Sequence, residues 1–212
     1  MNHDLKDFIP YFYKFFRKKK IKKFDNWNLV CENFKKKNPI NISKFRKNKK
    51  NKLMDLYYFM DRLGKISSKN NILVTDAGSN YYVGGQVWNF ENGQREVSSY
   101  TNAAMGLSIP LAIGAAVASP SAKILAVTGD GSLELNIQEL KTISHNKFDI
   151  KLFVINNGGY VSMHNWADAF FKGRRVDNPV DTGDGTLILK NVAKAFDMEH
   201  RLISSANNLD KI

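Results

Sequence analysis

The sequence predicts an α/β domain that is built on a doubly wound parallel sheet and preceded by a short basic helical extension. From residue 53 onward, short apolar runs that suit buried strands alternate with segments of helical periodicity. The charge divides at the same place: residues 1–52 carry 17 Lys and Arg against four Asp and Glu, whereas residues 53–212 carry 15 against 16. With 212 residues, the chain has room for one such domain and an extension.

The first 37 residues predict two amphipathic helices, because apolar side chains recur at three- and four-residue spacing from Leu5 to Phe16 and again from Phe24 to Phe34. Residues 38–52 are polar and rich in turn formers, which is typical of a linker. The basic side chains, with phenylalanines between them, could bind nucleic acid or could simply form solvated helix faces. Lys and Asn are abundant throughout the chain, so we favour solvated faces and expect no specific nucleic-acid partner.

Cysteine content and hydropathy indicate the cellular compartment in which the protein is expected. The single cysteine, Cys31, excludes an intrachain disulfide and favours a reducing compartment. The longest apolar stretch, residues 103–118, is interrupted by Ser108 and Pro110 and is shorter than the roughly 20 residues of a membrane span. The first residues lack the apolar core of a signal peptide. We therefore expect a soluble cytoplasmic protein with no membrane partner.

Within the domain, the pattern predicts these elements in order: a helix over 53–65, a strand over 72–75, a loop rich in Gly and Tyr, a helix of small residues near 103–118, a strand over 124–127, a helix from about 133 to 144, a strand over 150–155 and a helix over 187–196. Strands that alternate with helices indicate parallel pairing.

The strand over 124–127 runs into Gly129-Asp130-Gly131, where the glycines allow close approach of a ligand to the backbone. The segment from Leu133 to Ser144 has helical spacing, so we expect one amphipathic helix whose N-terminus lies beside Asp130. Free N–H groups at such an end favour phosphate. This first strand end therefore predicts a phosphate site.

The strand over 150–155 ends at the run Asn-Asn-Gly-Gly of residues 156–159, which completes a βαβ unit. Parallel strands end at the same edge, so Asp130 and Asn157, 27 positions apart, should meet where open α/β sheets bind ligands. Their oxygens, together with phosphate oxygens and water, suit Mg²⁺. Alternatively, Asp130 caps the helix and the Asn-Asn-Gly-Gly run is only a turn. Both alternatives would have to coincide at this spacing, so we favour the metal site.

This pattern, GDG followed after 24 residues by NN, resembles the thiamine diphosphate binding motif. The longer run 76–175 resembles the C-terminal domain of acetolactate (acetohydroxyacid) synthase large subunits. The strings that carry this likeness stand in that family's order and spacing: TDAG at 75–78, IPLAIGAAVA at 109–118, NIQEL at 136–140 and WADAFFK at 166–172. The resemblance covers most of residues 53–205. It implies thiamine diphosphate and Mg²⁺ as cofactors, and no FAD, because the FAD-binding central domain is essentially absent.

The resemblance also implies a domain plan. Residues 1–37 are expected to be a helical remnant of the central domain, 38–52 a polar basic linker, and 53–212 the thiamine diphosphate/Mg-binding domain, truncated at its C-terminus. The glutamate that ionises the cofactor lies on a pyrimidine-binding domain, which no part of this chain resembles. We therefore expect no catalytic residue in the chain and no turnover by the chain alone. We expect a pyrimidine-binding domain or chain as partner, in a homo- or hetero-oligomer.

The family's cofactor contacts map onto matching positions of this sequence. The implied metal ligands are the side chains of Asp130 and Asn157 and the backbone carbonyl of Gly159. The implied diphosphate contacts at the first strand end are Gly129, Gly131 and Ser132. A second phosphate-contacting turn is implied by Ala77, Ser79 and Asn80. Synthases usually carry Gln-His where this chain has Ser79-Asn80, and the alternative for these residues is a plain strand-to-helix turn.

Two further residues match the part of the family's site that holds the organic half of the cofactor. Met105 corresponds to the hydrophobic wedge under the thiazolium, and the carbonyl of Ala103 would accept a hydrogen bond from the aminopyrimidine. Without the resemblance, Met105 would be assigned to core packing. Tyr100, Thr101 and Ala103 stand where the family usually has glycine, which is a departure from its pattern.

Trp166 matches the tryptophan that selects the acceptor 2-oxo acid in acetohydroxyacid synthases; the alternative is that it packs into the core. Ser162 stands where synthases have methionine. The primary hypothesis is the diphosphate-binding half of a carboligase or decarboxylase that acts on a 2-oxo acid and is acetolactate synthase-like. One alternative is a 2-oxo acid decarboxylase half-subunit that works with a separate pyrimidine-binding chain. An alternative of another class is a non-catalytic basic binding module.

Overall fold

The computed structural model describes residues 4–19, 24–40, 54–175 and 185–209. The chain divides into two compact units, Met1–Ile40 and Asn41–Ile212. Most of the predicted linker, 38–52, lies outside the described residues. Within the described residues, no helix combines the length and apolar character that crossing a membrane requires.

The first unit consists of helices α1 (Leu5–Arg17) and α2 (Asp25–Lys37), as the apolar spacing predicts. Asp4 caps α1, because its carboxylate accepts a hydrogen bond from the Lys6 N–H at 2.9 Å. Aromatic rings contact one another along α1, for example Phe12 and Phe16, whose centroids are 4.4 Å apart. No residue of either helix is buried, so the described part of this unit has no core of its own.

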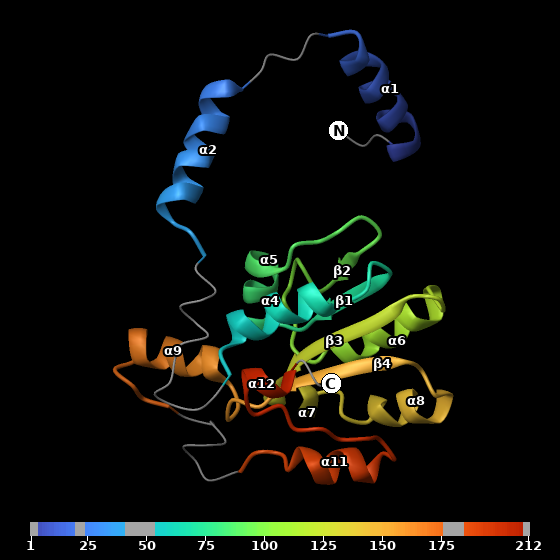
Figure 1. Ribbon diagram of the computed structural model, residues 1–212, viewed down its shortest axis with the longest axis vertical. Helices are drawn as coiled ribbons and strands as arrows, with labels where there is room; N and C mark the ends of the chain where they lie inside the picture. The colour runs from blue at the N-terminus through green and yellow to red at the C-terminus, as the bar shows by residue number, and fades with distance from the viewer. Residues whose placement is uncertain (1–3, 20–23, 41–53, 176–184, 210–212) are drawn as a thin grey trace. The chain divides into compact units, whose positions relative to one another are not determined.

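The second unit holds the α/β domain (Figure 1). Its elements are α4 (Leu56–Ile66), β1 (Asn71–Thr75), α5 (Ser79–Val87), β2 (Arg95–Val97), α6 (Ser108–Ala118), β3 (Lys123–Gly129), α7 (Asp130–Glu134), α8 (Glu139–Asn146), β4 (Ile150–Ile155), α9 (Val161–Phe170), α11 (Leu189–Ala195) and α12 (Ala206–Leu209). The four described strands pair in the order β2-β1-β3-β4, and every pair is parallel. Gly129 pairs with Ile155, so β3 and β4 end together.

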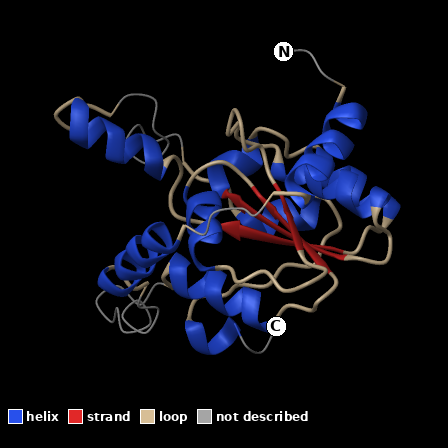
Figure 2. Ribbon diagram, turned by 90° about the horizontal axis from the view of Figure 1, so that it is seen from above, coloured by secondary structure: helices blue, strands red, loops and turns tan. Residues whose placement is uncertain are grey.

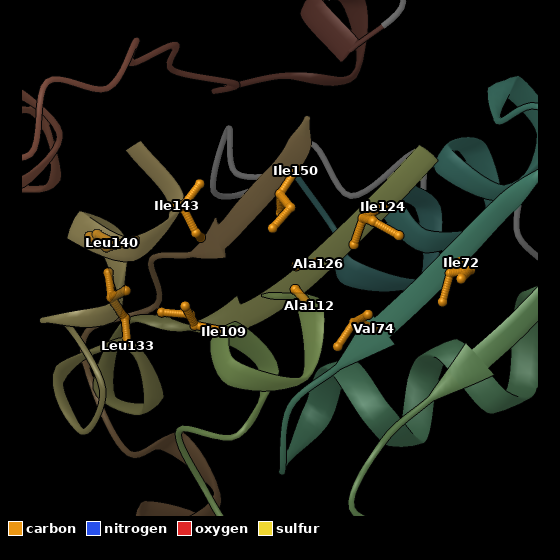
Figure 3. Close-up of a cluster of buried hydrophobic side chains, with 10 residues drawn as sticks. All are labelled: Ile72, Val74, Ile109, Ala112, Ile124, Ala126, Leu133, Leu140, Ile143 and Ile150. Atoms are coloured by element: carbon orange, nitrogen blue, oxygen red, sulfur yellow. The ribbon is translucent and has the colours of Figure 1, made fainter. Parts of the chain in front are cut away.

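Each face of the sheet is covered by a separate apolar cluster, and helices flank the strands in Figure 2. Side chains that alternate along β1 and β3 turn to opposite faces, as the two-residue period of strands requires. On one face they pack against α6, α7 and α8, and Figure 3 shows these side chains from strands and helices turned toward one another. On the other face they pack against α4 and α5. This arrangement confirms the predicted doubly wound α/β fold.

The structure corrects three of the expected elements. The loop predicted between residues 76 and 102 contains α5 and the short strand β2. The helix of small residues begins at Ser108 rather than near 103. The single helix expected over 133–144 is two helices, because residues 135, 136 and 139–141 each donate to the carbonyl three positions back, which tightens the chain into turns. That break brings the Asn136 side chain to the carbonyl of Gly106, at 2.8 Å.

β4 is the outer strand of the described sheet. A cavity of about 820 Å³ is lined by residues 152–155 of this strand and by residues 187–190 and 198–204. Asn156 and Asn157, which follow β4 directly, also line this cavity. The cavity beside β4 therefore extends to Asn156 and Asn157, where the candidate site begins.

Candidate cofactor site

Asp130 joins the ends of β3 and β4. Its side chain is 3% exposed. One carboxylate oxygen accepts from the N–H of Gly131 at 2.9 Å, and the other accepts from the N–H groups of Gly158 and Gly159 at 2.9 and 3.0 Å. Gly158 and Gly159 have φ of 86° and 100°, values that a side chain would oppose. This backbone conformation accompanies two successive N–H groups that both donate to Asp130, and it brings together the two strand ends that the sequence predicted would meet.

The Asn157 carboxamide lies against Asp130. One end of the carboxamide is 3.0 Å from the carbonyl oxygen of Gly159 and 3.2 Å from Asp130 Oδ1. The two ends of a carboxamide have the same shape, so either atom can take this place. A nitrogen there donates to both neighbours. An oxygen there would face two acceptor oxygens, an arrangement that would need a cation between them.

These three groups fit a small divalent cation. Ligands on adjacent corners of a Mg²⁺ octahedron, with metal–oxygen distances of about 2.1 Å, lie about 3.0 Å apart. The separations of 3.0 and 3.2 Å around the Asn157 atom match that spacing. In the described parts of the chain, no cluster of three His, Cys, Asp or Glu could hold a metal ion. A metal here would therefore depend on neutral carbonyl oxygens and on oxygens from its ligand.

The two glycines beside Asp130 differ in the space around them. A Cβ added to Gly129 would have no neighbour within 4 Å, which leaves room beside its backbone. A Cβ added to Gly131 would lie 2.6 Å from Cε1 of Tyr160, because that ring lies directly over it. The N–H of Gly131 donates to Asp130, so the predicted contact from this N–H to a diphosphate requires that hydrogen bond to be released. Ser132 is buried next to Gly131.

The negative charge of this turn affects two neighbouring side chains. The pKa of Glu134 is raised above its usual value, first by burial and then by the charge of Asp130. The pKa of the Tyr160 phenol is also raised, first by burial and then by the charges of Glu134 and Asp130. Burial is the larger cause of both shifts, and the carboxylates of this turn add to it at the place where the sequence predicts an anionic diphosphate. A cation would offset the negative charge of these carboxylates.

The turn between β1 and α5 carries the second set of predicted phosphate contacts. Ala77 and Ser79 are half-buried there. Asn80 is buried, and both ends of its carboxamide are occupied: Nδ2 donates to the carbonyl of Val127 at 2.9 Å, and Oδ1 accepts from the N–H of Tyr81 at 3.0 Å. The side chain of Asn80 thus fastens α5 to β3. Its second N–H is not used by these bonds, and its contact with phosphate stays a prediction.

Ala103 and Met105 lie on an exposed turn before α6. Ala103 has φ of 44°, the left-handed region that favours glycine, at a position where the family usually has glycine. Met105 is 36% exposed, so it is not packed in the core. Its role as a wedge stays a prediction, but the alternative of core packing does not describe this side chain.

Trp166 is on α9, which follows the Asn-Asn-Gly-Gly run. It is 59% exposed and contacts Phe170, with ring centroids 4.7 Å apart. The alternative that Trp166 packs into the core therefore does not hold in the described structure. Near the start of α9, Ser162 Oγ would lie 3.8 Å from a Cβ added to Gly78, so the beginning of this helix faces the turn after β1.

Two polar side chains that the sequence did not single out connect these segments. Asp76, directly after β1, is 1% exposed and accepts hydrogen bonds from Ala77, Gly106, Ser108 and Thr128. Asn136 donates to the carbonyl of Gly106. An acidic residue placed straight after a buried strand is the one signal that could have indicated Asp76. The sequence holds no comparable signal for Asn136.

The fold and the site define an α/β protein whose candidate ligand site lies at the carboxyl edge of a parallel sheet. Residues 76–212 match the family described as "Thiamine pyrophosphate enzyme, C-terminal TPP binding domain". The chain belongs to this family of thiamine pyrophosphate enzymes and carries their C-terminal TPP binding domain.

Individual relatives agree with this assignment. Acetolactate synthase 2, chloroplastic, of Zea mays is 28% identical over 184 residues, which cover 85% of this chain and 28% of the relative. The acetolactate synthase large subunit of Cyanidium caldarium is 36% identical over 121 residues, which cover 56% of this chain and 20% of the relative. The fold is similar to that of a thiamine diphosphate-dependent 4-hydroxybenzoylformate decarboxylase of Rhodococcus jostii, with a TM-score of 0.66 and 17% identity over 74% of this chain and 29% of that one. The chain thus spans less than a third of each of these proteins.

Proposed function

We propose that this chain binds thiamine diphosphate through a Mg²⁺ ion held by Asp130, Asn157 and the carbonyl of Gly159, as the diphosphate-binding part of an acetolactate synthase-like enzyme. The observation that carries the proposal is the convergence of these three groups at separations of 3.0 and 3.2 Å. The family assignment supports the identity of the cofactor.

Charge makes the metal necessary in this proposal. The site contributes the carboxylates of Asp130 and Glu134, and a diphosphate adds further negative charge. A Mg²⁺ ion held by the carboxylate of Asp130, the carboxamide oxygen of Asn157 and the carbonyl of Gly159 would reduce this repulsion and would leave positions for diphosphate oxygens and water. Metal and diphosphate should therefore bind together, and each should bind weakly without the other.

The remaining residues would orient the cofactor. Thiamine diphosphate supplies carbanion stabilisation, which lets a 2-oxo acid lose CO₂. The Ser132 side chain and the turn of Ala77 and Ser79 would hold the diphosphate. The carbonyl of Ala103 would accept a hydrogen bond from the aminopyrimidine, and Met105 would support the thiazolium. The exposed Trp166 would contact the substrate.

We infer further that catalysis needs a second domain or chain that supplies the glutamate of the pyrimidine-binding domain. The relatives named acetolactate synthase support a carboligase that joins two 2-oxo acids. The serine at position 162, where synthases carry methionine, is a departure from the synthase pattern and leaves a 2-oxo acid decarboxylase as the second candidate. Product analysis of a complemented enzyme distinguishes the two: acetolactate or a homologue for the first, an aldehyde for the second.

Calorimetric titration of the full chain tests the metal site. Thiamine diphosphate should bind weakly with Mg²⁺ and not at all with a chelator present. Asp130→Ala should abolish binding, since it removes the only carboxylate among the three ligands. Asp149→Ala is the matched control, because Asp149 is an exposed carboxylate that pairs with Lys151 at 2.8 Å. Unchanged binding by Asp130→Ala would remove the metal assignment.

Complementation tests the catalytic part of the proposal. Adding a pyrimidine-binding domain that carries the glutamate should produce CO₂ from pyruvate or a related 2-oxo acid. The rate should depend on the concentrations of both proteins, because the site would form across their interface. Asn157→Ala should abolish the gain. If CO₂ release needs no added domain, the two-part site is wrong.

A further inference from the structure

The segments that carry the predicted cofactor contacts are tied together by two buried or half-buried polar side chains. These segments are the turn after β1, the turn before α6 and the turn after β3. Asp76 Oδ1 accepts from the N–H groups of Ala77 and Gly106 at 2.8 and 2.9 Å. Asp76 Oδ2 accepts from the Ser108 N–H at 3.3 Å and from the Thr128 hydroxyl at 2.9 Å. One carboxylate thus contacts the turn after β1, the turn before α6 and Thr128 in β3, two residues before Asp130.

Asn136 holds the same turn from its other side. Its Nδ2 donates to the carbonyl of Gly106 at 2.8 Å. A Cβ added to Gly106 would lie 2.7 Å from Cβ of Leu135 and 3.2 Å from the carbonyl of Ser132, so the backbone is clamped closely against the segment after β3. Gly106 is buried, whereas Ala103 and Met105 are exposed. The exposed turn of Ala103 and Met105 is therefore followed by a buried residue, Gly106, whose N–H and carbonyl are both held by side-chain hydrogen bonds.

We propose that Asp76 and Asn136 are positioning residues that fix the distance between the turn of Ala103 and Met105 and the diphosphate site after β3. This inference rests on the proposed function. A ligand held at both ends binds tightly only when the two holding sites are already at the right separation, because ordering them during binding costs affinity. Loosening the turn should weaken the hold on the organic end and leave the diphosphate end intact.

The test compares two ligands that share one end. The full chain is titrated with thiamine diphosphate and, separately, with inorganic diphosphate, each with Mg²⁺. Asn136→Ala should weaken thiamine diphosphate about tenfold, which corresponds to about 1.4 kcal/mol, and should leave inorganic diphosphate within about twofold. Asn146→Ala is the matched control, because Asn146 also donates its carboxamide to a backbone carbonyl, that of Thr142, at 2.8 Å, but at the exposed end of α8. Equal losses for both ligands, or no loss for either, would overturn the proposal.

Asp76→Asn and Asp76→Ala provide a graded second measurement. The asparagine can keep the bonds to Ala77 and Gly106, because its oxygen can take the place of Oδ1 while its nitrogen donates to the Thr128 hydroxyl, and it loses the longer bond from the Ser108 N–H at 3.3 Å. Asp76→Asn should therefore keep most of the difference in affinity between thiamine diphosphate and inorganic diphosphate, whereas Asp76→Ala should lose this difference. Equal behaviour of the two variants would contradict the assigned role.

Amide hydrogen exchange separates this inference from the proposed function. If the wild-type chain binds neither ligand, the proposed function fails. The exchange of the Gly106 N–H still decides whether the turn is held: it should be slow in the wild type, about tenfold faster in Asn136→Ala and unchanged in Asn146→Ala. Fast exchange in the wild type would show that the turn is not fixed.

Discussion

Replacing Gly131 by alanine should destabilise the metal-free protein by about 1–3 kcal/mol, the usual cost of forcing extra volume into a packed site. The added Cβ would lie 2.6, 2.9 and 3.2 Å from three ring atoms of Tyr160. All three distances are shorter than an ordinary carbon–carbon contact of about 3.5–4.0 Å. A rigid ring cannot bend away from one atom, so Tyr160 or the turn must shift as a whole.

Urea denaturation of the wild type and variants measures this cost as the free energy of unfolding. Gly129→Ala is the matched control, since its Cβ would meet nothing within 4 Å. Its stability should stay within about 1 kcal/mol of the wild type or rise, because alanine restricts the unfolded chain. The double variant Gly131→Ala/Tyr160→Ala should show coupling: with the ring removed, the added methyl should cost almost nothing. If Gly131→Ala costs the same with and without the tyrosine ring, the contact does not determine the effect.

Three further predictions concern charge and specificity. Glu134→Gln should leave the free energy of unfolding unchanged below about pH 4 and raise it by less than about 1 kcal/mol near pH 7. The reason is that a carboxyl whose pKa is raised on folding loses its stabilising contribution as pH rises through that pKa. Unfolding titrations across this pH range check the prediction, and saturating Mg²⁺ should reduce the difference between the variant and the wild type. Residues 1–52, with 17 basic side chains, should bind nucleic acid only nonspecifically, so affinity measured by fluorescence anisotropy should fall steeply with salt and not depend on sequence. In a complemented enzyme, Trp166→Leu should change the ratio of acceptor products and leave CO₂ release from the donor largely intact, whereas an unchanged product ratio would remove this tryptophan from the substrate site.

The sheet and the meeting of its two strand ends could be predicted because both depend on local patterns. β4 begins and ends where its apolar run does, at Ile150 and Ile155. Parallel strands bring their ends together whatever the rest of the chain does, so the contact between Asp130 and the turn at 158–159 follows from topology alone. A short edge strand such as β2, with three partly exposed residues, leaves no comparable pattern.

The network around the candidate site could not be predicted, because it consists of side chains that bond to the backbone of distant segments. Asp76 and Asn136 are each 30 positions from Gly106. An aspartate or asparagine in a turn has many possible local partners, and only the folded chain selects one of them. Asn80 shows the same limit, since its bond to the carbonyl of Val127, 47 positions away, had no signal in the sequence.

The position of β4 at the outside of the described sheet has a consequence for how the site keeps its order. Two of the three proposed metal ligands, Asn157 and Gly159, follow a strand that is paired, among the residues that the structure describes, with β3 alone. Local opening of such a strand requires only one set of backbone hydrogen bonds to break, and it would separate these ligands from Asp130. Cofactor binding and the local opening of β4 are therefore linked equilibria, because a bound cofactor would favour the closed strand. A ligand that joins Asp130 to residues 157–159 should slow amide exchange along the whole of β4, well beyond the residues that it contacts.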